Sequence, residues 1–237
     1  DLLRILIKDR VAPFVTEELQ NRGLKVTISN GNGEIFFKEV QENEILIVRS
    51  ATQVNKEVID AALKTGVLKL IIRAGVGLDN IDVKYAQAKG IKVLNTPEAS
   101  SSSVAELALT HMFALTRMLI PANLAMRKHE WNKNSYLGME LSGKALGIIG
   151  MGRVGRKLAQ KASALGMKIL YYDIAIPEGI DENWKYLTLE EVLANADFTS
   201  LHVSADNNNG YLIDEPQLKK MKKTAFLINT ARGSLVN

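Results

Sequence analysis

The chain has 237 residues, of which 46% are hydrophobic and 24% are charged, and it contains no cysteine. This composition is typical of folded globular domains, so it excludes a disordered or fibrous protein, and the missing thiols exclude a disulfide framework and a thiolate metal site. The net charge of +4 is small and spread along the chain, which argues against a nucleic-acid partner, and we predict no metal site.

Short runs rich in Ile and Val alternate with amphipathic stretches over residues 1–97, which is the pattern of β-α-β units in a parallel sheet. The predicted strands are Arg4–Lys8, Lys25–Ser29, Ile45–Val48, Leu68–Ile72 and Lys92–Asn95. The predicted helices are Val15–Asn21, Lys56–Lys64 and Val83–Ala88, closed by Gly23, Gly66 and Gly90. We therefore predict a doubly wound α/β domain that ends at Thr96-Pro97.

A long helix is predicted from Ser103 to about Arg127. Ser103 is a favourable N-cap, and Glu106 three residues later completes the pattern of a capping box. Apolar residues occupy most faces of this helix, including Leu107, Phe113 and Leu119. We therefore expect the helix to be buried, either within one subunit or in a dimer built on the second domain.

The same stretch is the most apolar part of the chain, from Leu107 to Met126. Its apolar sequence is interrupted at His111, Arg117 and Pro121. A spanning helix needs about 20 apolar residues, so we predict no membrane span. The absence of cysteine fits a reducing compartment, and we expect a cytoplasmic protein.

A second strand–helix series begins at Ala145. Its predicted strands are Leu146–Ile149, Lys168–Tyr172, Phe198–Val203 and Ala225–Asn229. The fold prediction is therefore α/β, with two doubly wound parallel-sheet domains of the Rossmann or flavodoxin kind. Because the second sheet stops soon after a strand, we expect the C-terminal part of the fold to lie outside this chain.

The second series contains a glycine motif, Gly150-Met151-Gly152-Arg153-Val154-Gly155. It follows the predicted strand Leu146–Ile149 and opens a predicted helix, Arg156–Leu165. The next strand ends at Asp173, eighteen residues after Gly155, which is close to the spacing expected in a dinucleotide-binding fold. Asp173 is predicted to bind a ribose and to repel a 2′-phosphate, so the motif predicts NAD rather than NADP.

The three glycines of the motif and the two residues before Gly155 each have an expected structural role. Gly150 allows the tight turn, Gly152 lets the backbone approach a pyrophosphate, and Gly155 lets helix and strand pack closely. The N–H groups of Arg153 and Val154 lie at the positive end of the helix and are predicted to bind phosphate. The alternative is an ordinary strand–helix turn without a ligand.

Two arginines follow strands of the first domain, Arg49 after Ile45–Val48 and Arg73 after Leu68–Ile72. Residues at the carboxyl ends of parallel strands line the ligand crevice, and guanidinium groups bind carboxylate or phosphate bidentately. Ala74-Gly75-Val76-Gly77 then offers small residues whose N–H groups can meet a carboxylate. We predict an anionic substrate; the alternative is that both arginines form surface salt bridges.

Several of these motifs together resemble the D-isomer-specific 2-hydroxyacid dehydrogenases. The matching segments, in chain order, are Arg73–Asp82, Asn95-Thr96-Pro97, Ser103–Glu106, the glycine motif and Asn229-Thr230-Ala231-Arg232-Gly233. Within the family, Val48-Arg49-Ser50-Ala51-Thr52 is most similar to the branch that oxidises D-3-phosphoglycerate to 3-phosphohydroxypyruvate, at the start of serine synthesis. The resemblance implies a substrate-binding domain over 1–97 and an NAD-binding Rossmann domain over 98–237.

The resemblance also implies roles for individual residues. Arg232 matches the catalytic arginine, which grips the substrate carboxylate and orients C2 toward the nicotinamide. Arg49 matches the arginine at the substrate's phosphate, supported by Arg73. The remaining matches to substrate positions are Ser50, Gly75, Val76 and Gly77. The matches to cofactor-binding positions are Val76 again and Arg232, with Thr230 and Ala231 beside the nicotinamide and Val203 near the adenosine half.

In the family a histidine accepts the hydroxyl proton during hydride transfer, and a glutamate holds that histidine. Both lie downstream of the arginine motif, and this chain ends five residues after Arg232. We therefore expect neither residue in these 237 residues, and we expect little turnover from them alone. None of His111, His129 and His202 matches the family's position, so we assign no catalytic histidine.

Other functions stay open at this point. A related enzyme would act on glyoxylate, hydroxypyruvate or D-lactate. A different class of protein would keep the fold only to sense NAD(H). We expect a small phosphorylated hydroxy acid as the substrate and a homodimer or higher homo-oligomer as the assembly.

Overall fold

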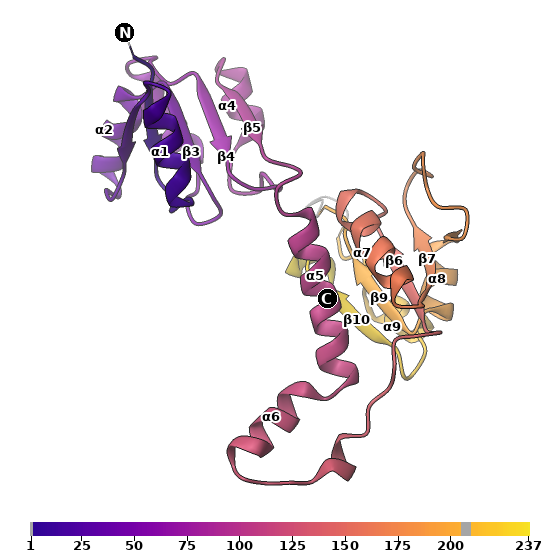
Figure 1. The fold of residues 1–237 in the computed structure, drawn as a ribbon. Helices are drawn as coiled ribbons and strands as arrows, with labels where there is room; N and C mark the ends of the chain where they lie inside the picture. Colours follow the sequence, from indigo (N-terminus) through magenta and orange to yellow (C-terminus); the bar gives the residue numbers. More distant parts are fainter. Residues whose placement is uncertain (1, 205–209) are drawn as a thin grey trace. The chain divides into compact units, whose positions relative to one another are not determined.

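The computed structural model describes residues 2–204 and 210–237. The chain divides into two compact units, Asp1–Ser100 and Ser101–Asn237, here called unit 1 and unit 2 (Figure 1). The predicted boundary stood three residues earlier, at Pro97. Both units contain a five-stranded parallel sheet with helices packed on it, which confirms the predicted fold class.

The sheet of unit 1 has the order β2-β1-β3-β4-β5. Its strands are β1 (Arg4–Ile7), β2 (Lys25–Ile28), β3 (Ile45–Val48), β4 (Leu70–Arg73) and β5 (Lys92–Asn95). Its helices are α1 (Pro13–Asn21), α2 (Glu34–Glu42), α3 (Lys56–Leu63) and α4 (Val83–Ala88). This is the flavodoxin-like order, in which the direction of winding reverses between β1 and β3.

Alternate residues of these strands are buried on opposite faces of the sheet. Leu6 packs with α2 and α3 on one face, whereas Ile5 and Ile7 lie in a cluster with Leu19 of α1 on the other. A strand covered on both faces reads as a continuous apolar run, which explains why β1 and β3 could be located from sequence.

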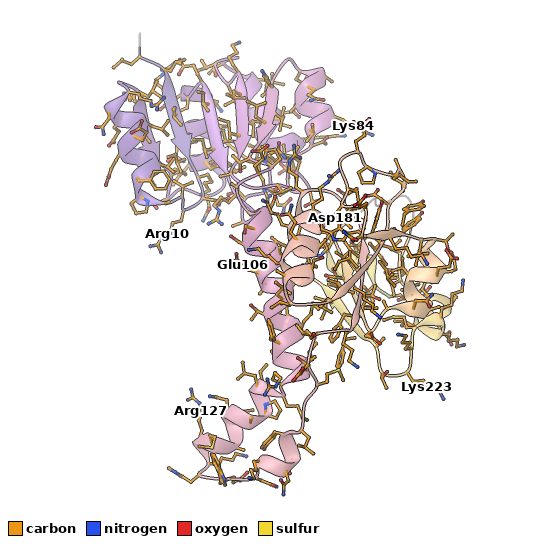
Figure 2. All side chains as sticks on the ribbon, turned by 45° about the vertical axis from the view of Figure 1, so that its right-hand side comes forward. Arg10, Lys84, Glu106, Arg127, Asp181 and Lys223 are labelled. Atoms are coloured by element: carbon orange, nitrogen blue, oxygen red, sulfur yellow. The ribbon has the colours of Figure 1, made fainter. Side chains whose placement is uncertain are left out.

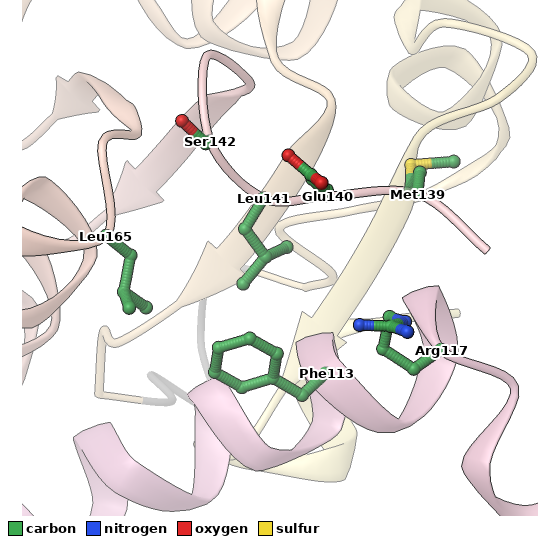
Figure 3. Close-up of a pocket in the computed structure, with 7 residues that line it drawn as sticks. All are labelled: Phe113, Arg117, Met139, Glu140, Leu141, Ser142 and Leu165. Atoms are coloured by element: carbon green, nitrogen blue, oxygen red, sulfur yellow. The ribbon is translucent and has the colours of Figure 1, made fainter.

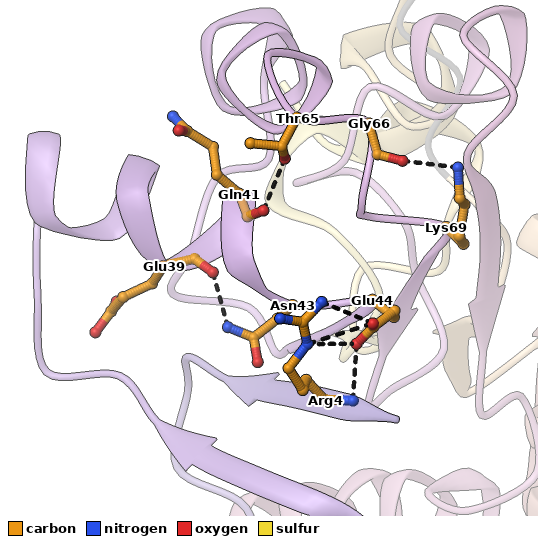
Figure 4. A network of polar contacts seen from close by, with 8 residues as sticks. All are labelled: Arg4, Glu39, Gln41, Asn43, Glu44, Thr65, Gly66 and Lys69. Carbon is orange, nitrogen blue, oxygen red and sulfur yellow. Dashed lines mark hydrogen bonds and ion pairs between the residues drawn. The ribbon is translucent and has the colours of Figure 1, made fainter. Parts of the chain in front are cut away.

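A polar network ties the amino ends of the strands together (Figure 4). The Glu44 carboxylate accepts hydrogen bonds from the backbone N–H of Arg4 at 2.8 Å and from its Nη2 at 2.9 Å. The Arg4 guanidinium lowers the pKa of Glu44 from 4.5 to about 2. At the C-terminus of α2, Asn43 donates to the carbonyl of Glu39 at 2.8 Å. Polar side-chain contacts hold this edge of the sheet, and the opposite, carboxyl edge carries the predicted site.

The sheet of unit 2 has the order β10-β9-β6-β7-β8. Its strands are β6 (Ala145–Ile149), β7 (Lys168–Tyr172), β8 (Lys185–Tyr186), β9 (Phe198–Leu201) and β10 (Phe226–Asn229). Its helices are α5 (Ser101–Thr116), α6 (Leu119–Arg127), α7 (Arg153–Ala164), α8 (Leu189–Asn195) and α9 (Glu215–Lys220), with short 3₁₀ turns at Lys133–Tyr136 and Gly233–Leu235. Taken in chain order this is a Rossmann arrangement, with its switch point between β6 and β9.

Helices α5 and α7 share one face of this sheet. Ala108 and Met112 of α5 and Leu158 of α7 are fully buried in one cluster with Ile148 of β6. On the other face, α8 buries Val192 beside Ile149 and Leu201. The glycine motif lies between β6 and α7, so both of its flanks are fixed by the core.

The predicted single helix from Ser103 to Arg127 is wrong, because the structure has two helices there, α5 and α6. Met118 between them adopts a left-handed conformation with φ 49° and ψ 38°. Pro121 explains the break: it has no N–H, and its ring would clash with the carbonyl four residues earlier, at Arg117, if the helix continued.

The predicted N-terminus of this helix is also wrong. Helix α5 begins at Ser101, so Ser103 lies inside its first turn and is not the N-cap. Glu106 instead accepts from the hydroxyl of Ser102 at 3.2 Å and pairs with Lys161 of α7 at 2.9 Å. The carboxylate therefore links two packed helices.

The apolar residues singled out in this region are not buried within the chain. Leu107, Phe113 and Leu119 have exposed fractions of 48%, 42% and 59%. The buried side of α5 consists of smaller residues, including Ala105 and Ala108. Within residues 2–204 and 210–237 no single helix is long and apolar enough to cross a membrane; α5 and α6 meet that condition only as a pair, and the pair bends by 63°.

Candidate functional site

The glycine motif forms the turn between β6 and α7, and its three glycines have different surroundings. Gly150 has a φ of +96°, and a Cβ there would lie 2.7 Å from the carbonyl oxygen of His202. A Cβ on Gly155 would overlap the carbonyl oxygen of Gly150 and lie 3.1 Å from Ile148. These two positions need glycine for the fold itself.

Gly152 is different, because a Cβ there would meet no atom within 4 Å. Gly152 is the N-cap of α7 and offers no side chain to accept from the first turn of the helix. Helix N–H groups that lack a side-chain cap favour an anion at this end. Open space above Gly152 and the uncapped helix end together fit a pyrophosphate.

Asp173 directly follows β7 and is hydrogen-bonded to the glycine motif. Its Oδ2 accepts from the backbone N–H of Met151 at 2.7 Å, and its Oδ1 accepts from that of Ile174 at 2.7 Å. Carboxylate oxygens have further lone pairs, so these bonds hold the group in place without using its capacity to accept from a ribose. The structure therefore brings the predicted acid to the predicted loop.

The segment after β9 borders the same turn. Val203 lies beside Gly150, since a Cβ on Gly150 would be 2.8 Å from a Val203 methyl group. The His202 ring is 2.9 Å from the Ser200 hydroxyl, and burial lowers the pKa of His202 from 6.5 to about 4. The imidazole is therefore neutral at pH 7, in keeping with its burial.

The loop after β10 carries Arg232, and its conformation is fixed by Asn229, a residue to which the sequence analysis assigned no role. Asn229 accepts from the N–H of Ala231 at 3.1 Å and donates to the carbonyl of Arg232 at 2.8 Å. The Arg232 guanidinium also donates to the carbonyl of Ala231 at 2.9 Å. An Asn followed by a short polar turn is a recognisable signal for such a local cap.

Thr230 lies in the same loop. Its hydroxyl oxygen is buried, and it has no hydrogen-bond partner among the residues that the structure describes. A buried hydroxyl without a partner costs free energy, so an orphan of this kind beside the expected nicotinamide position fits a ligand that supplies one.

In unit 1 the structure places both predicted arginines at neighbouring strand ends. Arg73 is the last residue of β4 and pairs in register with Val48 of β3, which Arg49 follows directly. Arg49 and Ser50 are exposed, whereas Arg73 is half-buried. A Cβ on Gly75 would lie 2.8 Å from the guanidinium carbon of Arg73, so this side chain lies over the glycine.

The small-residue loop after Arg73 is held by the segment after β5. Asn95 donates from its side chain to the carbonyl of Val76 at 2.6 Å, and the N–H of Thr96 donates to the carbonyl of Gly75 at 3.0 Å. These bonds use carbonyl oxygens of the loop. They fix the segment from Gly75 to Gly77, where the backbone was predicted to meet a carboxylate.

A separate cavity of about 270 Å³ lies near the C-terminus of α5 (Figure 3). Phe113, Leu141 and Leu165 form its apolar walls, and Arg117 and Glu140 supply charge. Its lining includes none of the predicted site residues. The predicted residues of unit 2 lie in the loops after β6, β7, β9 and β10, and those of unit 1 lie after β3 and at the end of β4.

Comparison with known proteins gives a consistent family. Residues 109–237 match the family model described as D-isomer specific 2-hydroxyacid dehydrogenase, NAD binding domain. A hydroxypyruvate reductase of Thermotoga maritima is 41% identical over 99% of the chain and 76% of its own length. A D-3-phosphoglycerate dehydrogenase of Methanocaldococcus jannaschii is 38% identical over the whole chain, which spans only 45% of that relative.

Solved structures agree with these matches. The D-lactate dehydrogenase of Aquifex aeolicus, in complex with NAD and lactic acid, superposes with a TM-score of 0.84 and 30% identity, covering 98% of this chain and 70% of that one. The predicted cofactor NAD is confirmed at the level of the domain. The individual contact residues stay predictions.

Replacing Gly152 with Ala tests the fit of the loop to NAD. The methyl group would enter space that is empty in the protein, so we expect unchanged thermal stability and an NAD affinity at least about tenfold weaker, measured by calorimetric titration. Gly155→Ala is the comparison: its methyl overlaps the backbone, so stability should fall as well. Unchanged NAD affinity in Gly152→Ala would contradict the predicted pyrophosphate position.

The His202 pKa predicts a pH dependence of stability. The unfolded chain binds a proton at His202 below about pH 6.5, whereas the folded protein resists it until about pH 4. Stability from this group is therefore complete above pH 6.5 and is lost as the pH falls toward 4, by at most about 3 kcal/mol. Denaturant unfolding between pH 7 and 4 should show a shallower decline in His202→Gln; an unchanged decline would assign the effect to other groups.

Proposed function

The chain belongs to the D-isomer specific 2-hydroxyacid dehydrogenases, and from this premise we propose that it serves the NAD-dependent oxidation of D-3-phosphoglycerate to 3-phosphohydroxypyruvate. This reaction is the first step of phosphorylated serine synthesis. We also propose a cytoplasmic location, which the cysteine-free composition favours.

One observation carries the choice of a phosphorylated substrate. Arg49 and Arg73 occupy the carboxyl ends of adjacent strands, β3 and β4. Arg232 is assigned to the substrate carboxylate, so the two further cations at these strand ends are explained by a second anionic group. Guanidinium pairs with phosphate bidentately, so Arg49, whose side chain is exposed, is assigned to the phosphate.

The other residues supply binding and orientation. Arg232 binds the substrate carboxylate, and Asn229 keeps its loop in place through the two bonds described above. The glycine motif and Asp173 hold the dinucleotide, and Thr230 and Ala231 are assigned to its nicotinamide end. Bound NAD supplies the hydride acceptor. We assign the proton of the substrate hydroxyl to none of the three histidines in this chain.

A second substrate also has support. The relative from Thermotoga maritima is named hydroxypyruvate reductase and is 41% identical, slightly more than the phosphoglycerate dehydrogenases. Hydroxypyruvate differs from 3-phosphohydroxypyruvate only by the phosphoryl group, so Arg49 separates the two proposals. A protein that only senses NAD(H) would bind the dinucleotide but turn over neither substrate.

The test is NADH oxidation by the full-length protein with each of these two substrates. We expect Arg49→Ala to lower kcat/KM for 3-phosphohydroxypyruvate by about 100-fold or more and for hydroxypyruvate by less than about threefold, because one charge-assisted contact of about 3 kcal/mol serves the phosphate alone.

Arg22→Ala is the matched control. It removes an exposed arginine of unit 1 that pairs only locally, with Glu18 in the same segment at 2.8 Å, and both activities should survive. Equal losses on the two substrates in Arg49→Ala would remove the phosphate assignment. Binding of NAD without turnover of either substrate would favour the sensor.

We propose a homodimer built on unit 2. The arm, residues 117–138, leaves the end of α5 and returns where the N–H of Met139 donates to the carbonyl of Thr116 at 3.1 Å. Figures 1 and 2 show its helix α6, which carries Arg127, standing away from the sheet of unit 2. Six of its large apolar side chains are more than half exposed, namely Leu119, Ile120, Leu124, Met126, Trp131 and Leu137. An apolar surface of this extent marks an interface.

Sedimentation of the native protein tests the dimer. We expect a dimer for the native chain and a monomer, or an association at least about tenfold weaker, for Leu124→Glu, because a carboxylate buried in an apolar interface is unpaired. Phe14→Glu changes an apolar residue on α1 of unit 1 that is even more exposed than Leu124, and it should leave the dimer intact. A native protein that sediments as a monomer would refute the proposal.

A further inference from the structure

In unit 1 the loop Arg49–Thr52, which follows β3, is held from two sides by side chains outside it. We propose that Asp9 and Asn80 are positioning residues that direct the Arg49 side chain toward a phosphorylated substrate. The inference rests on the function proposed above, because it concerns the residue assigned to the phosphate.

Asp9 holds the N–H side of the loop. It follows β1, and its Oδ2 accepts from the backbone N–H of Arg49 at 2.6 Å and from that of Thr52 at 3.2 Å. Its Oδ1 accepts from the Thr52 hydroxyl at 2.7 Å. Three hydrogen bonds, two from backbone N–H groups and one from a hydroxyl, therefore fix the loop at both of its ends.

Asn80 holds the carbonyl side of the same loop. Its side-chain nitrogen donates to the carbonyl of Arg49 at 2.7 Å and to that of Thr52 at 2.6 Å, which uses both of its hydrogens. Asn80 is 8% exposed, and its backbone carbonyl accepts from the backbone N–H of Val54 at 2.7 Å. A buried residue that is itself anchored in the backbone therefore draws the two ends of the loop together.

The consequence concerns Arg49 in particular. Both its N–H and its carbonyl are fixed, whereas its side chain is exposed and its Nη1 donates only weakly, to the carbonyl of Arg10 at 3.3 Å. Packing does not direct this side chain, so its starting direction comes from the backbone. A guanidinium directed in advance loses less rotamer entropy when it binds a phosphate.

The topology places this arrangement where a ligand is expected. Asp9 follows β1 and Arg49 follows β3, the two strands between which the winding of the sheet reverses. Ligands of open α/β sheets bind at such switch points. Asp9 is an unfavourable charge beside a phosphate, and three donors directed at it offset that repulsion. Its role is therefore to accept hydrogen bonds, and its charge is not needed.

This distinction defines the experiment. Asn at position 9 can accept both N–H groups with its oxygen and donate to the Thr52 hydroxyl, so Asp9→Asn keeps the geometry, whereas Asp9→Ala removes it. Thr52→Val is a milder change that removes only the hydroxyl donor. Asp60→Ala is the matched control, because it removes a carboxylate of unit 1 that accepts from Tyr85 and does not touch the loop.

Each variant of the full-length protein is assayed with 3-phosphohydroxypyruvate and hydroxypyruvate, and melting and amide hydrogen exchange of residues 49–52 are measured in parallel. We expect Asp9→Ala to raise KM for the phosphorylated substrate at least about tenfold and to change the hydroxypyruvate values less than about threefold. Exchange of the loop should accelerate. Asp9→Asn and Asp60→Ala should resemble the native protein, and Thr52→Val should show a smaller loss with the same selectivity.

The outcomes separate this inference from the proposed function. Equal losses on both substrates in Asp9→Ala, or an Asp9→Asn variant as damaged as Asp9→Ala, would overturn the positioning role. If Asp9→Ala does not fold, the selectivity of Thr52→Val decides alone. If Arg49→Ala is selective and the Asp9 variants are not, only the inference fails. If Arg49→Ala is itself unselective, the phosphate assignment and the inference fail together.

Discussion

Both sheets contain only parallel strands, and this constraint decides where the chemistry of the chain lies. In a parallel sheet every carboxyl end meets the same edge, and at the switch point the connections to either side diverge and leave room for a ligand. The switch point of unit 1 lies between β1 and β3, and that of unit 2 between β6 and β9. The glycine motif, the arginines and their supporting residues all lie at these edges.

The two units differ in how the backbone is arranged at the carboxyl edge of the sheet. Unit 1 uses polar side chains: Asp9, Asn80 and Asn95 bond to loop N–H and carbonyl groups. Unit 2 uses Asp173 and Asn229 in the same way, and in addition it has glycine in the turn after β6, so that this turn packs against the segment after β9 and leaves the start of α7 open. The first solution orients a side chain toward a ligand, and the second brings the backbone itself close to one.

The apolar pattern predicted most of this framework. Ile45–Val48, Lys92–Asn95 and Lys168–Tyr172 have the predicted bounds. For Ile45–Val48 the reason is burial on both faces of the sheet, which leaves a continuous apolar run. The two-residue strand β8 gives no such run and was not predicted. The break between α5 and α6 was not predicted, because the apolar character of residues 103–127 favours one continuous helix, whereas the clash of the Pro121 ring with the preceding turn decides the structure.

The supporting side chains differ in how far they could have been predicted. Asn229 caps a turn within three residues of itself, so its role follows from local sequence. Asp9 bonds to residues forty positions away, and it reaches them only because β1 lies beside β3. The order of the strands in a sheet does not follow from the order of strands and helices along the chain. The ends of the strands can be predicted from the apolar runs, but which polar side chains meet there depends on the order in which the strands assemble.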